Sequence, residues 1–209
     1  MASRLKNHFP EDSQEKIHWS ASGEKHIADV KTESGVVLKF QHSFLCPEER
    51  DARERFYQKM VWVVDGQRQD RVKFFASLGD AINVSDKLRI FLVPSNEGAL
   101  LRDWGASRVP VYFDFRDSEP GDTQRFDTPT LWRLNPRSPN GSAYLRPVPK
   151  MFFLHVHRKG RPFERECTEI AAAIERAVAD YLRQLASRFR APTDFDRYLA
   201  RRQQKRRRF

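Results

Sequence analysis

Residues 26–43 read HIADVKTESGVVLKFQHS, and this stretch decides the fold of the chain. Two runs of strand-forming residues lie on either side of the polar segment Glu33-Ser34-Gly35, whose composition is typical of a hairpin turn. A three-residue loop centred on Ser34 places Asp29 directly opposite Lys39 on the neighbouring strand. The stretch therefore predicts an antiparallel β-hairpin.

The predicted hairpin has one polar and one apolar face, because side chains alternate between the two sides of a strand. The polar face comprises Asp29, Lys39, Gln41 and Ser43, and the opposite face comprises Ala28, Val30, Leu38 and Phe40. A polar face on such a hairpin is unusual and marks a candidate site. The same register puts His26 opposite His42, away from Asp29, and we interpret these histidines as structural neighbours rather than as metal ligands.

The composition fits one substantial α/β domain. The chain has 209 residues, of which 39% are hydrophobic and 32% charged, and its sixteen Phe and four Trp argue against disorder. The net charge of +10 predicts a polyanionic partner. Two distant cysteines, Cys46 and Cys167, form no metal-binding pair, and with no apolar run of about 20 residues we expect a cytoplasmic protein without membrane contact.

The segment after the hairpin predicts a right-handed crossover. Pro47 and two following glutamates favour a helix start, and the helix is expected to continue to about Lys59. The apolar run Met60–Asp65 is typical of a strand buried on both faces and paired in parallel. A first strand is expected at Glu15–Trp19.

The second half of the chain predicts further strands and a long amphipathic helix. Strands are expected at Leu88–Val93, Val109–Phe115, Thr130–Leu134 and Met151–Val156, and the helix at Phe163–Phe189. His155 and His157 would share a face of the last of these strands, but with no third ligand in view we expect a structural role for them. Residues 191–209 read as a basic, disordered tail.

A hairpin with an acidic residue facing polar residues, followed by a helix and another strand, resembles the core of the PD-(D/E)XK nucleases. Within that superfamily, the motifs HIADV at 26–30, FQHS at 40–43 and VWVVDG at 61–66 resemble the competence protein CoiA-like family. The resemblance implies an α/β fold with a mixed central sheet of the PD-(D/E)XK type, made of the hairpin and the βαβ crossover. Flanking helices, extra strands and the long C-terminal helix would complete it.

The resemblance also implies a division of the chain. Residues 1–70 would form the nuclease-like core with a truncated N-terminal helix, 71–190 would continue the α/β domain, and 191–209 would be the tail. Hydrolysis of a phosphodiester needs Mg²⁺ or Mn²⁺ to polarise the phosphate and to lower the pKa of a water molecule. The resemblance implies Asp29 as a metal ligand and Asp29, Lys39 and Gln41 as the catalytic positions.

Lys39 departs from the family pattern, which implies a glutamate at this position. An ammonium group beside Asp29 would pair with the carboxylate and repel a divalent cation, so we expect metal affinity to fall. Two functions stay open. The first is a metal-dependent endonuclease acting on DNA, weakened or inactivated by Lys39. The alternative is a non-catalytic nucleic-acid-binding protein descended from a CoiA-like nuclease.

Four further residues are candidate contacts with nucleic acid, namely Lys31, Ser43, Arg53 and Tyr57. Arg53 and Tyr57 lie one helical turn apart and either approach the phosphate backbone or brace Gln41, and an ordinary surface pair is the other interpretation. The long C-terminal helix leaves room for a protein partner or a homo-oligomer.

Overall fold

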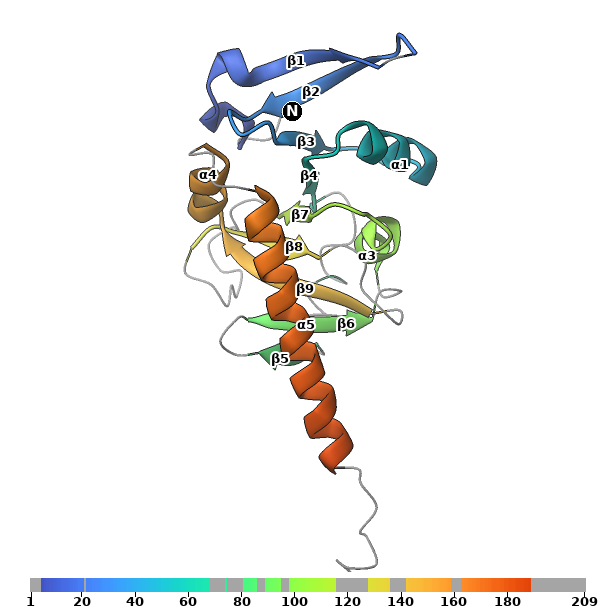
Figure 1. The fold of residues 1–209 in the computed structure, drawn as a ribbon, viewed down its shortest axis with the longest axis vertical. Coiled ribbons are helices and arrows are strands. Elements are labelled where there is room, and N and C mark those ends of the chain that lie inside the picture. Colours follow the sequence, from blue (N-terminus) through green and yellow to red (C-terminus); the bar gives the residue numbers. More distant parts are fainter. Residues whose placement is uncertain are drawn as a thin grey trace, which may run out of the picture.

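A nine-stranded mixed sheet forms the body of the computed structural model, with the strands in the order β1-β2-β3-β4-β7-β8-β9-β6-β5 (Figure 1). The structure describes residues 5–20, 22–67, 74, 81–85, 89–94, 98–115, 128–135, 142–158 and 163–188. The strands are β1 Gln14–Trp19, β2 Lys25–Lys31, β3 Val37–Gln41, β4 Met60–Asp65, β5 Ile82–Ser85, β6 Ile90–Pro94, β7 Val111–Asp114, β8 Thr130–Leu134 and β9 Ser142–Pro149. The helices are α1 Pro47–Phe56, α3 Ala99–Trp104, α4 Lys150–Arg158 and α5 Phe163–Arg188, with short 3₁₀ turns at Lys6–His8 and Glu11–Ser13.

The predicted hairpin is confirmed. Thr32 N–H donates to Val36 O and Gly35 N–H donates to Thr32 O, each over 2.9 Å, which closes the three-residue loop. Gly35 has a φ of 81°, a conformation that glycine adopts without a steric penalty. The antiparallel pairs Val30↔Leu38 and Lys31↔Val37 define the predicted register, in which Asp29 faces Lys39.

The predicted crossover is also confirmed. Strand β4 pairs in parallel with β3, and α1 connects them with Pro47 in its first turn. The helix ends at Phe56, three residues earlier than Lys59. Strand β7 continues the sheet in parallel with β4, so both segments 1–70 and 71–190 contribute to a single sheet.

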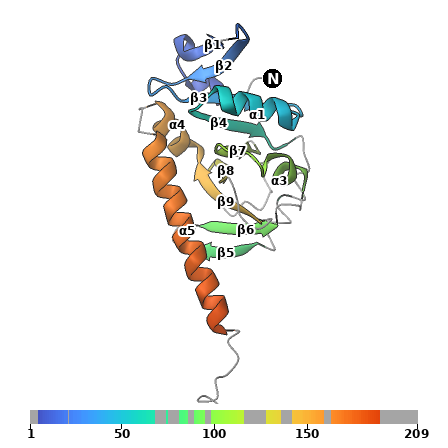
Figure 2. The same cartoon turned by 45° about the vertical axis from the view of Figure 1, so that its right-hand side comes forward.

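Two hydrophobic clusters cover the two faces of the sheet. Helices α1 and α3 lie on one face, and α4 and α5 lie on the other (Figures 1 and 2). Trp62 and Phe113 belong to the first cluster, and Leu38 and Val61 to the second. Alternate residues of β4 therefore enter different clusters, which explains why this strand is apolar throughout.

The alternation predicted that Ala28 shares a layer with Leu38 and Phe40, and this prediction is wrong. Ala28 packs in the cluster of Trp62, whereas Leu38 and Phe40 lie in the other cluster. At this point of the hairpin, the Asp29 carboxylate accepts the Phe40 backbone N–H over 2.6 Å. The regular alternation of β2 is interrupted at this residue.

The prediction of a strand at Met151–Val156 is wrong, because this segment lies within helix α4. Phe153, Leu154 and His157 are buried at helical spacing against the sheet, and the Phe153 ring lies 4.8 Å from the Tyr112 ring. A six-residue apolar run fits a strand and a helix equally well, so its position against the sheet decides the outcome.

The helix separates the two histidines that a strand would have put on one face. His155 is exposed on α4 and His157 is buried, so they do not form a chelating pair. Burial, with a smaller contribution from the Arg133 charge, lowers the pKa of His157 to about 4.

We expect stability to fall as the pH is lowered from about 6.5 towards 4. His157 stays neutral in the folded protein but takes up a proton in the unfolded chain at its ordinary pKa of 6.5, so the unfolded state gains protons first. The full loss is about 3 kcal/mol for a shift of this size. Urea unfolding at a series of pH values should show a shallower dependence for His157→Phe. The exposed His155→Phe variant is the control, and equal slopes for wild type and His157→Phe would contradict the assignment.

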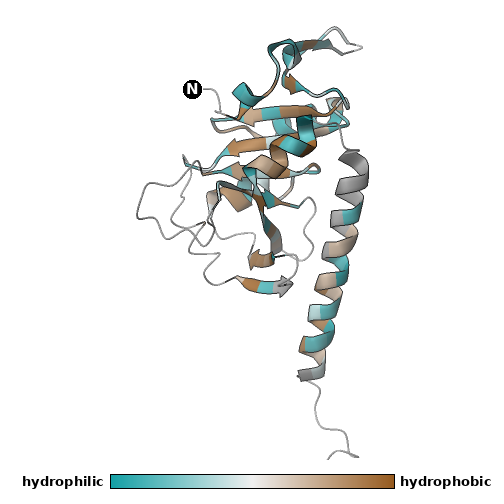
Figure 3. Cartoon of the chain, turned by 90° about the vertical axis from the view of Figure 1, so that its left-hand side faces the viewer, coloured by the Kyte–Doolittle hydropathy of each residue, from teal (hydrophilic) through white to brown (hydrophobic). Residues whose placement is uncertain are grey.

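Helix α5 confirms the predicted C-terminal helix and ends at Arg188. Its residues alternate between hydrophobic and hydrophilic along its length (Figure 3). Ala177 and Val178 pack against Ile90 and Tyr144, whereas Leu182 is exposed. The tail at 191–209 lies outside the described residues. None of the described helices combines the length and apolar character needed to cross a bilayer.

Candidate functional site

Asp29 and Lys39 form an ion pair at the centre of the hairpin. Lys39 Nζ lies 2.6 Å from Asp29 Oδ1 and donates a second hydrogen bond to Ile27 O over 2.9 Å. The other carboxylate oxygen, Asp29 Oδ2, accepts the Phe40 N–H over 2.6 Å. The side chains of Lys39 and Asp29 are only 11% and 19% exposed, so water screens their attraction less than at an open surface. Both oxygens of Asp29 are therefore engaged by the protein itself.

This arrangement does not fit a divalent cation. A metal ion at Asp29 would have to displace the Lys39 ammonium, which occupies one carboxylate oxygen and repels positive charge. Within the described ranges, no group of three or more His, Cys, Asp and Glu side chains is arranged to hold a metal ion. The metal-binding role that the sequence implied for Asp29 stays a prediction, and the charge of Lys39 opposes it.

Gln41 lies two residues beyond Lys39, at the end of β3, and its amide group is directed to Ser43. Gln41 Nε2 donates to Ser43 O over 2.9 Å and to Ser43 Oγ over 3.2 Å. Gln41 is buried at 9% exposure, and Ser43 is exposed. The structure thus groups the predicted residues into two pairs, Asp29 with Lys39 and Gln41 with Ser43.

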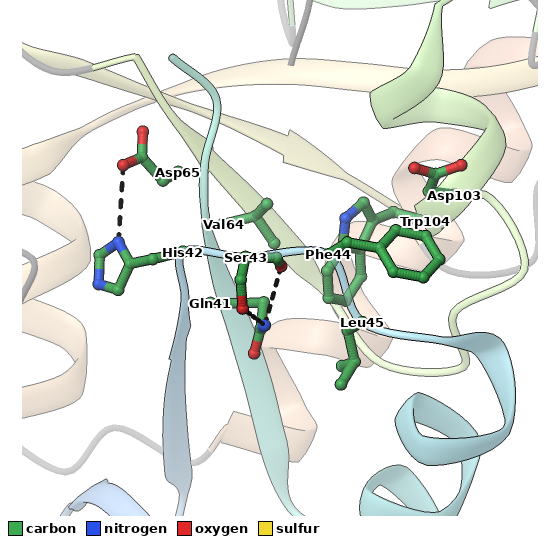
Figure 4. A pocket seen from close by; sticks show the side chains of 9 residues that line it. All are labelled: Gln41, His42, Ser43, Phe44, Leu45, Val64, Asp65, Asp103 and Trp104. Atoms are coloured by element: carbon green, nitrogen blue, oxygen red, sulfur yellow. Dashed lines mark hydrogen bonds and ion pairs between the residues drawn. The ribbon is translucent and has the colours of Figure 1, made fainter. Parts of the chain in front are cut away.

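A pocket of about 290 Å³ opens at the carboxyl ends of β3 and β4 (Figure 4). Crevices outside the carboxyl ends of parallel strands are the usual ligand sites of open α/β sheets. The lining residues come from the end of β3 and the loop after it, from β4, and from α3: Gln41, His42, Ser43, Phe44, Leu45, Val64, Asp65, Asp103 and Trp104. Of the predicted site residues, the pocket lining therefore includes Gln41 and Ser43 but neither Asp29 nor Lys39.

Asp65 and Asp103 are polar residues of this pocket that sequence reasoning missed, and Asp65 lies at the end of β4. The Oδ2 atom of Asp65 lies 3.5 Å from His42 Nδ1, and Asp65 Oδ1 accepts the Gln67 N–H over 3.0 Å. Asp114 occupies the equivalent position on β7 and pairs with Lys150 over 3.0 Å. The signal was present in the sequence, because each aspartate directly follows a buried apolar run. This pattern indicates a site only when β4 and β7 are known to be parallel neighbours, because Asp65 and Asp114 then lie side by side.

Tyr57 lies beneath the candidate site and not at the surface. It is 6% exposed, and its hydroxyl has no hydrogen-bond partner in the part of the chain that the structure describes. Burial and the nearby negative charge of Asp29 raise the pKa of Tyr57 to about 12, and the Arg53 charge opposes this shift. Tyr57 therefore stays protonated at physiological pH and lies within electrostatic reach of Asp29.

The other two predicted nucleic-acid contacts, Arg53 and Lys31, reach the surface. Arg53 pairs with Glu49 one turn earlier on α1, and its side chain is 29% exposed. Lys31 is exposed at the end of β2. These two cations reach solvent, as a contact with a phosphate backbone requires.

Comparisons of this chain with protein-family models, with curated proteins and with solved structures give no match. The resemblance to the CoiA-like family is thus a prediction carried by the motifs between residues 26 and 66. Any function for the site has to be argued from its geometry and charge.

Proposed function

We propose that this protein binds nucleic acid with a fold of the PD-(D/E)XK nuclease type, in which an ion pair has replaced the metal centre. The order of elements supports the proposal. Strands β1, β2 and β3 form an antiparallel meander, and α1 then crosses to β4, which pairs in parallel with β3. An acidic residue on β2 faces the next strand, as the CoiA-like resemblance implies for this core.

The Asp29–Lys39 pair is the observation on which the proposal depends. In a metal-dependent nuclease, carboxylates hold the cation that polarises the phosphate. Here an ammonium group lies 2.6 Å from the only carboxylate of the hairpin's polar face. The pair is electrically balanced without a metal ion, so we expect cleavage by this chain to be weak or absent.

The net charge of +10 supports a polyanionic partner. The second candidate function is a metal-dependent DNA endonuclease, which the position of Asp29 on the hairpin favours. The two candidates differ in one testable respect, which is whether Lys39 prevents cleavage.

Plasmid and single-stranded DNA, incubated with Mg²⁺ or Mn²⁺, provide the test. We expect the unaltered chain to bind both without cutting, and Lys39→Glu to gain metal-dependent cleavage because it supplies a second carboxylate beside Asp29. Lys39→Met is the matched control, since it removes the ammonium group without adding a ligand. Adding Asp29→Ala to Lys39→Glu should abolish the gained activity.

Two results would overturn the proposal. Efficient cleavage by the unaltered chain, lost in Asp29→Ala, would establish the endonuclease instead. Failure of the chain to bind any nucleic acid would remove both candidates.

A further inference from the structure

The pocket at the carboxyl ends of β3 and β4 has an exposed aromatic side chain in its lining. Phe44 is 67% exposed, although phenylalanine is usually a core residue. Trp104 also lines the pocket, and its ring is fixed against the Trp62 ring with 5.2 Å between centroids. Phe44 and Trp104 lie on the same side of the pocket (Figure 4). Two aromatic side chains in one pocket offer a surface on which a planar ligand can stack.

Two polar residues of the lining present acceptor oxygens. Gln41 uses its amide nitrogen in both hydrogen bonds to Ser43, so the group that it has left for a ligand is the acceptor Oε1. Asp103 adds a carboxylate on a side chain that is 21% exposed. The described residues that line the pocket include no lysine or arginine. The pocket therefore suits a ligand with N–H donors, and it does not suit a phosphate group.

A cation lies at the edge of the pocket. Arg102 precedes Asp103 on α3, and its side chain is 68% exposed. Arg102 Nε lies 3.4 Å from Asp103 Oδ1, so the charge of this carboxylate is partly neutralised. The contact weakens the attraction of the pocket for a free organic cation and leaves the carboxylate as a hydrogen-bond acceptor. The exposed guanidinium group is at the same time available to a phosphate outside the pocket.

We propose that the pocket binds an unpaired nucleobase with an exocyclic amino group, stacked against Phe44 and with its phosphate at Arg102. Carboxylates accept hydrogen bonds from such amino groups when proteins read cytosine. In a duplex the amino group is paired with the partner base, so the ligand has to be unpaired or flipped out. The volume of about 290 Å³ is at the small end for ligand sites, which suits one ring system rather than a base pair.

This inference rests on the proposed function and adds a preference for base type and for single strands. Lys39 and Gln41 lie on the same face of β3, because their neighbours Trp62 and Val64 on β4 belong to one cluster. A separation of two residues corresponds to ~7 Å along a strand. A nucleic acid with one base in the pocket would therefore pass close to the Asp29–Lys39 pair.

Anisotropy of labelled oligodeoxycytidine and oligothymidine tests the pocket in the unaltered chain. The two bases have the same ring size, but cytosine carries an amino group where thymine carries a carbonyl oxygen. We expect tighter binding of oligodeoxycytidine. Phe44→Ala should weaken this binding at least about fivefold, and Phe44→Tyr should keep most of it, because a tyrosine ring also stacks. Phe152→Ala is the matched control, since Phe152 is 44% exposed on α4 and does not line the pocket.

Two further variants separate the base contact from the phosphate contact. Asp103→Ala should bring the ratio of the two affinities towards one, because it removes an acceptor for the amino group. Arg102→Gln should keep the ratio and lower the dependence of log K on log salt by about 0.7 for the lost phosphate contact. Competition by cytidine monophosphate distinguishes the source of the base. If the mononucleotide displaces the oligonucleotide, the site takes free nucleotides, and if it does not, the base belongs to a polynucleotide.

The outcomes separate this inference from the proposed function. Equal affinities for the two oligonucleotides that Phe44→Ala leaves unchanged would overturn the pocket assignment, while nucleic-acid binding stands. Binding of cytidine monophosphate that depends on Phe44, without binding of either oligonucleotide, would overturn the proposed function and keep the pocket as a nucleotide site. No binding of any of the three would overturn both. Calorimetric binding of choline that depends on Phe44, in place of nucleotide, would overturn the inference by assigning the pocket to an organic cation.

Discussion

Replacement of Glu54 by alanine should destabilise the protein by about 3–5 kcal/mol. The Glu54 side chain on α1 is 1% exposed. Its Oε1 accepts hydrogen bonds from Trp62 Nε1 over 3.0 Å and from Ser107 Oγ over 2.7 Å, and its Oε2 accepts the Arg108 N–H over 2.9 Å. Removal of the carboxylate leaves these buried donors without their acceptor, and unfulfilled buried donors are costly.

The charge balance adds to the effect, because Arg50 Nε lies 3.9 Å from Glu54 Oε1 and the Arg50 side chain is 6% exposed. The total stability of a domain is about 5–15 kcal/mol, so Glu54→Ala could prevent folding altogether. Glu54→Gln keeps the shape and the acceptor oxygen and should lose less. Urea unfolding gives the free energies of both variants.

Glu49→Ala is the matched control on the same helix. Glu49 pairs with Arg53 one turn later, but its side chain is 49% exposed, so its loss should change stability by less than about 1 kcal/mol. Equal effects of Glu49→Ala and Glu54→Ala would contradict the assignment of the buried network as the contact that holds α1 against β4.

Asp29→Ala should produce the second-largest loss, about 2–4 kcal/mol. The variant leaves the Lys39 ammonium at 11% exposure with the Ile27 carbonyl as its remaining acceptor, and it removes the acceptor of the Phe40 N–H. Lys39→Met should cost less, because the Asp29 carboxylate keeps the Phe40 N–H and reaches solvent at 19% exposure.

The double variant Asp29→Ala/Lys39→Met measures the coupling between the two side chains. We expect it to be more stable than the sum of the single changes predicts, since removal of both partners leaves no unpaired charge. Strict additivity would mean that the pair contributes nothing to the fold. In that case, the attraction between Lys39 and Asp29 would not stabilise the fold, and the effect of Lys39 on metal binding would be the remaining consequence of the pair.

The hairpin and the crossover could be read from the sequence because both depend on local patterns. Gly35 permits the turn, and the apolar run of β4 requires a strand buried on both faces. Asp29 and Lys39 were predicted to face each other from the loop length alone, and the 2.6 Å ion pair confirms it. The geometry of two facing strands follows directly from the turn that joins them.

Segment 142–158 could not be assigned in the same way. The strand β9 ends in Pro149, and the apolar residues after it fit either a strand or a helix. Contacts with Tyr112, far away in the sequence, hold the segment as α4. The pocket was missed for a similar reason, since Asp65 and Trp104 meet only after β4 and α3 have packed on the same sheet.

The sequence by itself determined the strand pairing of residues 26–43, the crossover that follows and the long C-terminal helix. It also determined that the Lys39 ammonium faces Asp29, where it opposes a metal ion. Each of these is set by residues close in sequence or by a single turn. Tertiary structure alone decided that α4 is a helix, that Tyr57 is buried and that Trp19 is left uncovered at the edge strand. Burial depends on what packs from elsewhere in the chain, and the periodicity of a short segment does not carry that information.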